Sequence, residues 1–319
     1  MQHGGRMKIA FLFSGQGSHY YHMGQELFEQ RGSFYRNAVV VDELIRQRLG
    51  VSIVAAIYDR RSRASDVFDR TLLTHSAIFL IEYALAKALM SEGVVPDVLV
   101  ATSMGAFAAL TLAGCISVEQ AIEVVVTQAT LLEQNCVPGG ILALPTASSY
   151  EAEVLAARFD CEVGLIGKWS ASSIAADQER LEAAEAALRN EGVMFQRLAV
   201  SRAFHSRWID AARVPFLASL ASVRINLPGI PIICCADIGA VSGIRKAHLW
   251  DIVRLPIRFE QAIEALCCRE YLRFIDVGPS GTLATSVKYC ARHQGLSCEI
   301  QTVLSPFGGA VERYRAAIK

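Results

Sequence analysis

The stretch Asp97–Leu110, which reads DVLVATSMGAFAAL, constrains the fold of this chain more than any other part of the sequence. Residues 98–100 form an apolar run typical of a buried strand, and the Ala- and Leu-rich residues after the turn are typical of a helix. Ser103 and Gly105 occupy the short turn between the two. This is the arrangement of a nucleophile elbow, in which the turn lifts the serine hydroxyl clear of the sheet and the helix N-terminus faces any oxyanion formed there.

The elbow sequence alone leaves a second interpretation open. Ala101 stands where the pattern Gly-x-Ser-x-Gly has its first glycine. Junctions between a strand and a helix also often carry a buried serine that only caps the helix. The pentapeptide therefore does not by itself distinguish a nucleophile from a structural serine.

The length and composition exclude several classes of protein. With 319 residues and 52% hydrophobic content, the chain can bury one large core and a smaller one. The formal net charge is zero, so no basic surplus favours a nucleic-acid or anionic membrane partner. Apolar runs such as 78–80 and 124–126 are too short to span a bilayer, and residues 1–6 lack a signal-peptide pattern. We expect a cytoplasmic monomer that contacts neither membrane nor nucleic acid.

The nine cysteines do not indicate a metal site. Two pairs are adjacent in sequence, Cys234/Cys235 and Cys267/Cys268, and no pair has the C-x-x-C spacing of metal ligands. We expect free thiols that serve as small apolar residues in a reducing compartment.

A glycine-containing loop follows the first predicted strand, Lys8–Phe13. The loop reads SGQGSH over residues 14–19, and the two glycines around Gln16 allow a sharp turn and a close backbone approach. A dinucleotide site is the alternative interpretation, but the third glycine and the acidic residue of that fingerprint are missing.

The order of predicted elements indicates two domains. Predicted helices over 74–90 and 117–134 flank the elbow. After Pro138-Gly139-Gly140 the sequence changes to short, alternating predicted strands and helices. The shorter units are a strand at 141–144, a helix from Ser148 to Phe159, strands at 162–166 and 172–175, a helix capped by Asp177, and a strand at 193–200. This β-α-β-β-α-β order is ferredoxin-like. We predict an α/β catalytic domain made of residues 1–136 and 200–319, with residues 137–199 inserted as a small domain.

His205 lies between Phe204 and Ser206, directly after the strand that returns from the inserted domain. A lone histidine next to an aromatic residue is more often structural than catalytic. A cleft is expected between two domains, however, and the return segment would border it. His205 is therefore a candidate site residue.

Four stretches taken together resemble the malonyl-CoA:acyl-carrier-protein transacylase family, the acyltransferases of fatty-acid and polyketide synthesis. In order they are GQGS at 15–18, the elbow at Ser103, AFHS at 203–206, and VGPSG at 277–281. The resemblance covers nearly all of residues 8–307. It implies an α/β-hydrolase-like large domain with a ferredoxin-like insertion. It also implies a substrate carried on the phosphopantetheine of an acyl carrier protein or on coenzyme A, with no bound cofactor or metal.

The resemblance also implies roles for five residues. Ser103 would be the nucleophile and His205 its general base and acid, since a serine hydroxyl needs a neighbouring base. The backbone N–H groups of Gln16 and Met104 would form the oxyanion hole. A backbone carbonyl would orient the histidine, and the matching position is near Ile252, where the family often has glutamine.

The positions at which this sequence differs from the family pattern bear on which acyl group the protein accepts. The family's malonyl-selective arginine falls at Gln128, which with Phe204 and Thr102 is expected to line the acyl pocket. A glutamine would leave a buried malonyl carboxylate underpaired, at a cost of roughly 2–5 kcal/mol, so we expect a neutral acyl group. Lys168, where the family tends to have asparagine, is either a replacement cation or a solvated lysine. Arg202 faces either the substrate channel or solvent.

An arginine-to-glutamine change with intact catalytic motifs is most like the stand-alone acyltransferase homologues of polyketide pathways whose synthases lack built-in acyltransferases. Within that group the chain most resembles the acyl hydrolases. We therefore expect a hydrolase acting on acyl-carrier-protein thioesters. A transacylase and a non-catalytic homologue that only binds carrier protein remain alternatives. An unrelated α/β-hydrolase esterase is disfavoured because the sequence offers no evident acidic triad member.

Overall fold

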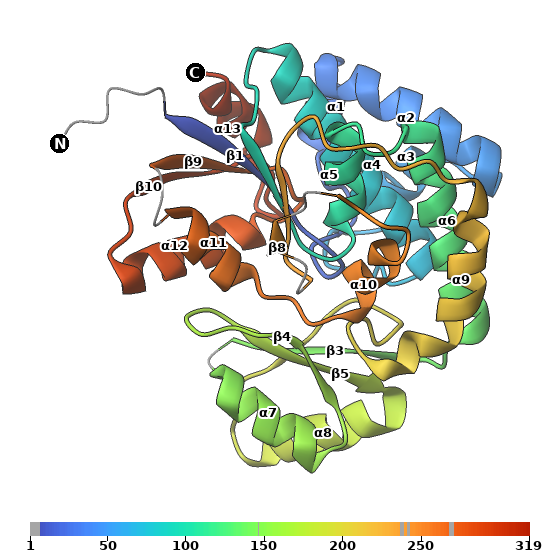
Figure 1. Cartoon of the computed structure of the whole chain (residues 1–319), viewed down its shortest axis with the longest axis vertical. Helices are drawn as coiled ribbons and strands as arrows, with labels where there is room; N and C mark the ends of the chain where they lie inside the picture. Colours follow the sequence, from blue (N-terminus) through green and yellow to red (C-terminus); the bar gives the residue numbers. More distant parts are fainter. Residues whose placement is uncertain (1–6, 146, 237–238, 241–242, 268–270) are drawn as a thin grey trace.

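The computed structural model describes residues 7–145, 147–236, 239–240, 243–267 and 271–319. It contains two sheets, one of six strands and one of four, and each carries its own helices (Figure 1). The larger sheet belongs to an α/β unit made from both ends of the chain. The predicted fold class is therefore confirmed.

The six-stranded sheet places the elbow beside the glycine-containing loop. Its order is β10-β9-β1-β2-β7-β8, and all neighbours pair in parallel except β7 and β8. The strands are β1 (Lys8–Phe13), β2 (Val98–Ala101), β7 (Ile232–Cys234), β8 (Gly239–Ala240), β9 (Leu272–Asp276) and β10 (Cys298–Thr302). Phe13 is in register with Ala101, so β1 and β2 end at the same edge of the sheet. The turn that follows each strand carries candidate site residues.

Alternate residues of β1 enter two separate cores. Phe11 and Phe13 belong to the larger apolar cluster, which includes most of the buried residues of α4. Ala10 and Leu12 belong to a second cluster on the opposite face. Helices therefore cover both faces of the sheet, as a parallel sheet requires. The helices of this unit are α1 (Gln25–Glu29), α2 (Ser33–Leu49), α3 (Ile53–Ile57), α4 (Thr71–Ser91), α5 (Gly105–Leu112), α6 (Val118–Asn135), α9 (Arg213–Ser219), α10 (His248–Arg254), α11 (Phe259–Cys267), α12 (Thr282–Gln294) and α13 (Ala310–Ala317), with 3-10 turns at Arg207–Ala212 and Leu220–Ser222.

Helix α4 is the central helix of the larger cluster. It packs against α2, α5 and α6. By length and composition alone it could cross a membrane, but 78% of its most apolar window is buried inside the fold. A mostly buried helix of this kind is typical of a protein core. Two of its polar residues, His75 and Glu82, are fully buried.

The small domain has the predicted ferredoxin-like order. Its elements are β3 (Gly139–Leu144), α7 (Ser149–Arg158), β4 (Glu162–Leu165), β5 (Ser172–Asp177), α8 (Gln178–Asn190) and β6 (Gln196–Arg197). The sheet order is β4-β5-β3-β6, and every pair is antiparallel. Ser148 and Glu151 form the predicted capping box of α7, and Asp177 caps α8. All these elements lie within the predicted range 137–199.

The last strand of the small domain is shorter than predicted. The sequence predicts a strand over 193–200, but only Gln196 and Arg197 pair with β3. This edge strand ends where the Val200 N–H turns back to the Leu198 carbonyl, at 2.8 Å. A backbone committed to such a turn cannot continue a ladder.

The β4–β5 loop fastens the small domain to the large one. The Glu260 carboxylate of α11 accepts hydrogen bonds from the backbone N–H groups of Lys168, Trp169 and Ser170, at 2.6–3.2 Å. The Lys168 ammonium lies 4.7 Å from the centre of the Trp169 ring. The Lys168 side chain is thus engaged with its own loop, which favours the interpretation of Lys168 as a rim residue. Eight cysteines are free thiols, as expected, whereas Cys268 lies outside the described residues.

We expect Gly105→Ala to destabilise the protein by about 1–3 kcal/mol, because overpacking forces the backbone to shift. A Cβ at position 105 would overlap the Ser14 carbonyl oxygen and lie 2.6 Å from the Phe13 carbonyl carbon. Gly32→Ala is the control, since a Cβ there meets no atom within 4 Å. Urea unfolding of both variants measures the difference. Equal stability of the two variants would contradict the close approach of α5 to β1.

Candidate active site

Ser103 lies at the turn between β2 and α5 with an unusual backbone conformation. Its φ is 49°, in the left-handed region that residues other than glycine seldom occupy. The side chain is 3% exposed, and α5 begins two residues later. The strained turn and the following helix are the two structural features of a nucleophile elbow. The sequence-predicted elbow is therefore present.

His205 is in hydrogen-bonding contact with Ser103. The distance from His205 Nε2 to Ser103 Oγ is 2.9 Å, and His205 Nδ1 lies 2.7 Å from the Leu255 carbonyl oxygen. A carbonyl can only accept, so Nδ1 carries the proton and Nε2 of the neutral ring is the acceptor for the serine hydroxyl. This tautomer is the one that a general base requires. His205 also has a positive φ, 62°.

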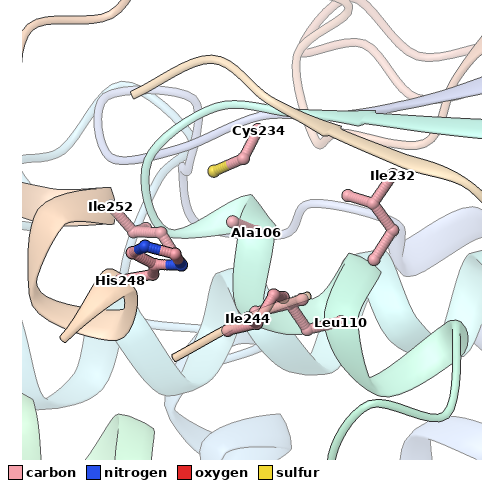
Figure 2. A pocket seen from close by; sticks show the side chains of 7 residues that line it. All are labelled: Ala106, Leu110, Ile232, Cys234, Ile244, His248 and Ile252. Atoms are coloured by element: carbon pink, nitrogen blue, oxygen red, sulfur yellow. The ribbon is translucent and has the colours of Figure 1, made fainter. Parts of the chain in front are cut away.

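The carbonyl that orients His205 belongs to Leu255, so the prediction of Ile252 is wrong by three residues. Leu255 directly follows α10 and has extended backbone angles, φ −81° and ψ 154°. Pro256 comes next, and the residue before a proline is disfavoured in the helical region. The backbone therefore leaves the helix at Leu255. Ile252 lies inside α10, where its side chain helps line a narrow apolar pocket between α5, β7 and α10 (Figure 2).

The loop of residues 14–18, SGQGS, packs directly against the elbow. A Cβ at Gly15 would lie 2.5 Å from the Ser103 Cβ, so only glycine permits this approach. Within the described part of the chain, the backbone N–H groups of Gln16 and Met104 donate no hydrogen bond. They flank the serine from two different turns. Two unengaged N–H groups beside a nucleophile are suited to receive an oxyanion.

Two of the three residues expected to line the acyl pocket, Phe204 and Gln128, lie next to His75. The His75 and Phe204 ring centres are 5.4 Å apart, and the Gln16 Nε2 atom lies 2.6 Å from His75 Nδ1. Burial lowers the pKa of His75 to about 3, so this ring is neutral. A close approach of the Gln128 side chain opposes that shift. Sequence reasoning missed His75, and the only signal was a polar residue inside an apolar helix.

Gln128 is fully buried, and its amide orientation can be assigned. Its Nε2 atom donates to the Leu249 carbonyl at 3.4 Å, which leaves Oε1 as the free end. Neither Gln128 Oε1 nor His75 Nε2 has a hydrogen-bond partner in the described ranges. Gln128 and His75 therefore contribute neutral polar atoms to this buried region.

Thr102 and Arg202 are both engaged in the scaffold. The Thr102 hydroxyl donates to the Phe13 carbonyl at 3.3 Å, so it is tied to the end of β1. The Arg202 guanidinium donates to the carbonyls of Leu132 and Glu133 in the last turn of α6, at 3.1 and 3.0 Å. Arg202 thus satisfies the C-terminal carbonyls of a helix, as cations there commonly do. The described residues contain no group of three or more His, Cys, Asp or Glu side chains suited to a metal ion.

Residues 10–316 match the acyl transferase domain family, which covers almost the whole chain. The chain belongs to this family. Its curated relatives include the polyketide biosynthesis acyltransferase homolog BaeD of Bacillus velezensis, 37% identical over 94% of this chain and 92% of that protein. The polyketide biosynthesis acyltransferase homolog PksD of Bacillus subtilis is 35% identical over 88% of this chain and 86% of that protein.

Solved structures of the family share the whole architecture of the chain. The acyltransferase domain from the second module of the salinomycin polyketide synthase superposes with a TM-score of 0.84 and 26% identity, covering 98% of this chain and 72% of that one. The malonyl CoA-acyl carrier protein transacylase of Burkholderia pseudomallei gives a TM-score of 0.78 and 28% identity, covering 90% and 98%. The large α/β domain with a small ferredoxin-like domain is therefore the fold of the family.

We expect the rate of acyl transfer to Ser103 to stay constant from pH 8 down to about pH 5. Burial disfavours the charged imidazolium and lowers the pKa of His205 to about 4. Only the neutral ring can accept the serine proton, so activity falls as the pH approaches that value. Single-turnover acylation rates at several pH values measure the profile, with circular dichroism to confirm folding. A tenfold loss between pH 7 and 5.5 would instead indicate an ordinary, solvent-exposed histidine.

Proposed function

We propose that this chain acts on acyl-carrier-protein thioesters in polyketide biosynthesis, that Ser103 receives the acyl group, and that water then releases it. The observation that carries the proposal is the 2.9 Å contact between His205 Nε2 and Ser103 Oγ, with the Nδ1 proton held by the Leu255 carbonyl. The relatives named as polyketide biosynthesis acyltransferase homologs support the pathway. Free thiols in the described residues support a reducing compartment, so we place the reaction in the cytoplasm.

Both halves of the proposed reaction use the Ser103 hydroxyl, the His205 ring and the oxyanion hole. Ser103 Oγ attacks the thioester carbonyl while His205 Nε2 accepts its proton, and the Gln16 and Met104 N–H groups stabilise the oxyanion. The C–S bond then breaks, and the imidazolium returns the proton to the leaving phosphopantetheine thiol. In the second half His205 takes a proton from water and the resulting hydroxide attacks the carbonyl of the acyl-Ser103 ester. The acyl C–O bond to Ser103 then breaks, and the imidazolium returns its proton to Ser103 Oγ as the carboxylic acid is released.

The acyl group is proposed to be neutral because the pocket offers it no cation. Gln128 occupies the position of the family's arginine, and the neighbouring His75 is neutral. A carboxylate is held best by the planar fork of an arginine, through two charge-assisted hydrogen bonds. An amide cannot supply that pairing in a buried site. Acetyl and other short uncharged acyl groups therefore fit the proposal better than malonyl.

A transacylase is the second candidate function, and the printed names of the relatives favour it. The acyl-Ser103 intermediate is common to both reactions, which differ only in the second nucleophile. A non-catalytic carrier-binding homologue has less support, because the serine, histidine and oxyanion loop all retain a catalytic arrangement.

Acetyl-loaded carrier protein, with and without a second unloaded carrier, distinguishes these functions. We expect free acetate to form without an acceptor and to be lost in Ser103→Ala. Intact-protein mass spectrometry and acetate quantification follow both products. Acyl-Ser103 that discharges only onto the second carrier would establish the transacylase instead. No acyl-enzyme in any condition would leave the carrier-binding homologue.

Gln128→Arg should raise the rate of malonyl loading onto Ser103 by about two to three orders of magnitude, because it restores the missing charge-assisted pair. Acetyl loading should fall or stay the same. Gln128→Met is the matched control, since it keeps the size of the side chain without adding charge. The ratio of malonyl to acetyl loading, measured in competition, reports the change. A ratio that does not rise with arginine would show that residue 128 does not select the acyl group.

A further inference from the structure

We propose that Glu82, in the middle of α4, is a positioning residue that holds the oxyanion loop (residues 14–18) against Ser103. The inference rests on the proposed function, since it concerns how the loop is kept ready for an oxyanion. Glu82 does not touch the reacting atoms. It acts through Ser14, the residue that joins β1 to the loop.

One carboxyl oxygen of Glu82 makes both contacts with the loop. Glu82 Oε1 accepts from the Ser14 backbone N–H at 2.7 Å and lies 2.8 Å from the Ser14 hydroxyl. The Ser14 hydroxyl is also 3.0 Å from the Ser18 hydroxyl, and the latter donates to the Gly15 carbonyl at 2.7 Å. The Ser14 hydroxyl has one proton, so it donates either to Glu82 Oε1 or to Ser18 Oγ, and the Ser14 backbone N–H is the donor that always ties the loop to α4.

Burying a carboxyl group at this position costs free energy of folding, so its hydrogen bonds to the loop are the feature that accounts for it. Glu82 is fully buried in an otherwise apolar part of α4, and Ser14 is its only hydrogen-bond partner among the described residues. Burial raises the pKa of Glu82 well above its ordinary value, and nearby Asp276 adds to the shift. Burial therefore favours the neutral form of the Glu82 carboxyl group. Asp276 is engaged elsewhere, because it accepts from the Gly278 and Ala284 N–H groups at 2.9 and 2.8 Å.

The loop needs a contact that fixes its position, because its own sequence allows many backbone conformations. Gly15 and Gly17 flank Gln16, and Gly17 has a φ of 94°, in the region open mainly to glycine. A glycine on each side of Gln16 lets its N–H group reorient easily. Oxyanion stabilisation depends on donors that are already placed when the charge develops. A fixed Ser14 limits how far the Gln16 N–H can move.

A neutral acid and a carboxamide present the same acceptor oxygen, so the test compares Glu82→Gln with Glu82→Met. Glu82→Gln should keep the acylation rate of Ser103 within about threefold of the unmodified protein. Glu82→Met should lower that rate by about 10–100-fold without changing KM, somewhat less than the 10²–10³-fold loss that follows removal of a whole oxyanion donor. Rapid-quench mass spectrometry with acetyl-loaded carrier protein measures both quantities.

Leu85→Ala is the control for packing, because Leu85 is equally buried in the same helix and its apolar side chain cannot hydrogen-bond to the loop. It should lower the stability of the protein and leave the acylation rate within about threefold at a temperature where the protein is folded. Ser14→Ala provides a second route if Glu82→Met does not fold, and it should lower the acylation rate three- to tenfold at unchanged KM.

Three results would overturn the inference. These are full activity in Glu82→Met or Ser14→Ala, an equal loss of rate in Glu82→Gln and Glu82→Met, and an equal loss in Leu85→Ala. Failure of Ser103 as the proposed nucleophile is distinct, because the unmodified protein would then form no acyl-Ser103 at all, whereas a transacylase would still form it.

Discussion

The hydrogen bond between Ser103 and His205 is the interaction on which the site depends, and the backbone is strained at both ends of it. Ser103 and His205 both have positive φ, at 49° and 62°, and such conformations cost of order 1–3 kcal/mol each for residues other than glycine. They persist because the surrounding structure determines them. The sheet holds Ser103 between β2 and α5, and the Val253 carbonyl accepts the His205 backbone N–H at 2.8 Å.

The site is built from neutral side chains and backbone dipoles. His205 is oriented by a carbonyl rather than a carboxylate, and burial keeps the rings of both His205 and His75 uncharged. Gln128 adds a neutral, fully buried amide to the same region. Such a buried set of neutral groups disfavours a charged acyl group, because desolvation of that group would go uncompensated. A site without charged side chains can still stabilise a short-lived oxyanion, because backbone N–H groups that are already in position donate hydrogen bonds to it.

The parts of the site that depend on local pattern could be predicted from the sequence. The elbow at Ser103 and the loop around Gln16 each follow a buried strand, and adjacent parallel strands bring such turns together. His205 became a candidate from its place after the inserted domain, and the family resemblance gave its role. The orienting carbonyl was misassigned to Ile252 because counting along the chain does not reveal where α10 ends, which Pro256 determines at Leu255. His75 and Glu82 could not be predicted as site residues. The sequence shows that each is a polar residue in an apolar helix, but it does not show which other residues the side chain contacts in the fold.

Peptide-level mass spectrometry of the acylated enzyme tests the central claim most directly. The protein would be mixed briefly with acetyl-loaded carrier protein, quenched in acid, digested, and sequenced by fragmentation. The account predicts a single acetyl adduct on Ser103 that forms rapidly in the unmodified protein and at least 100-fold more slowly in His205→Ala, since an unassisted serine is a poor nucleophile. An adduct on another residue, or one on Ser103 that forms equally fast without His205, would contradict it.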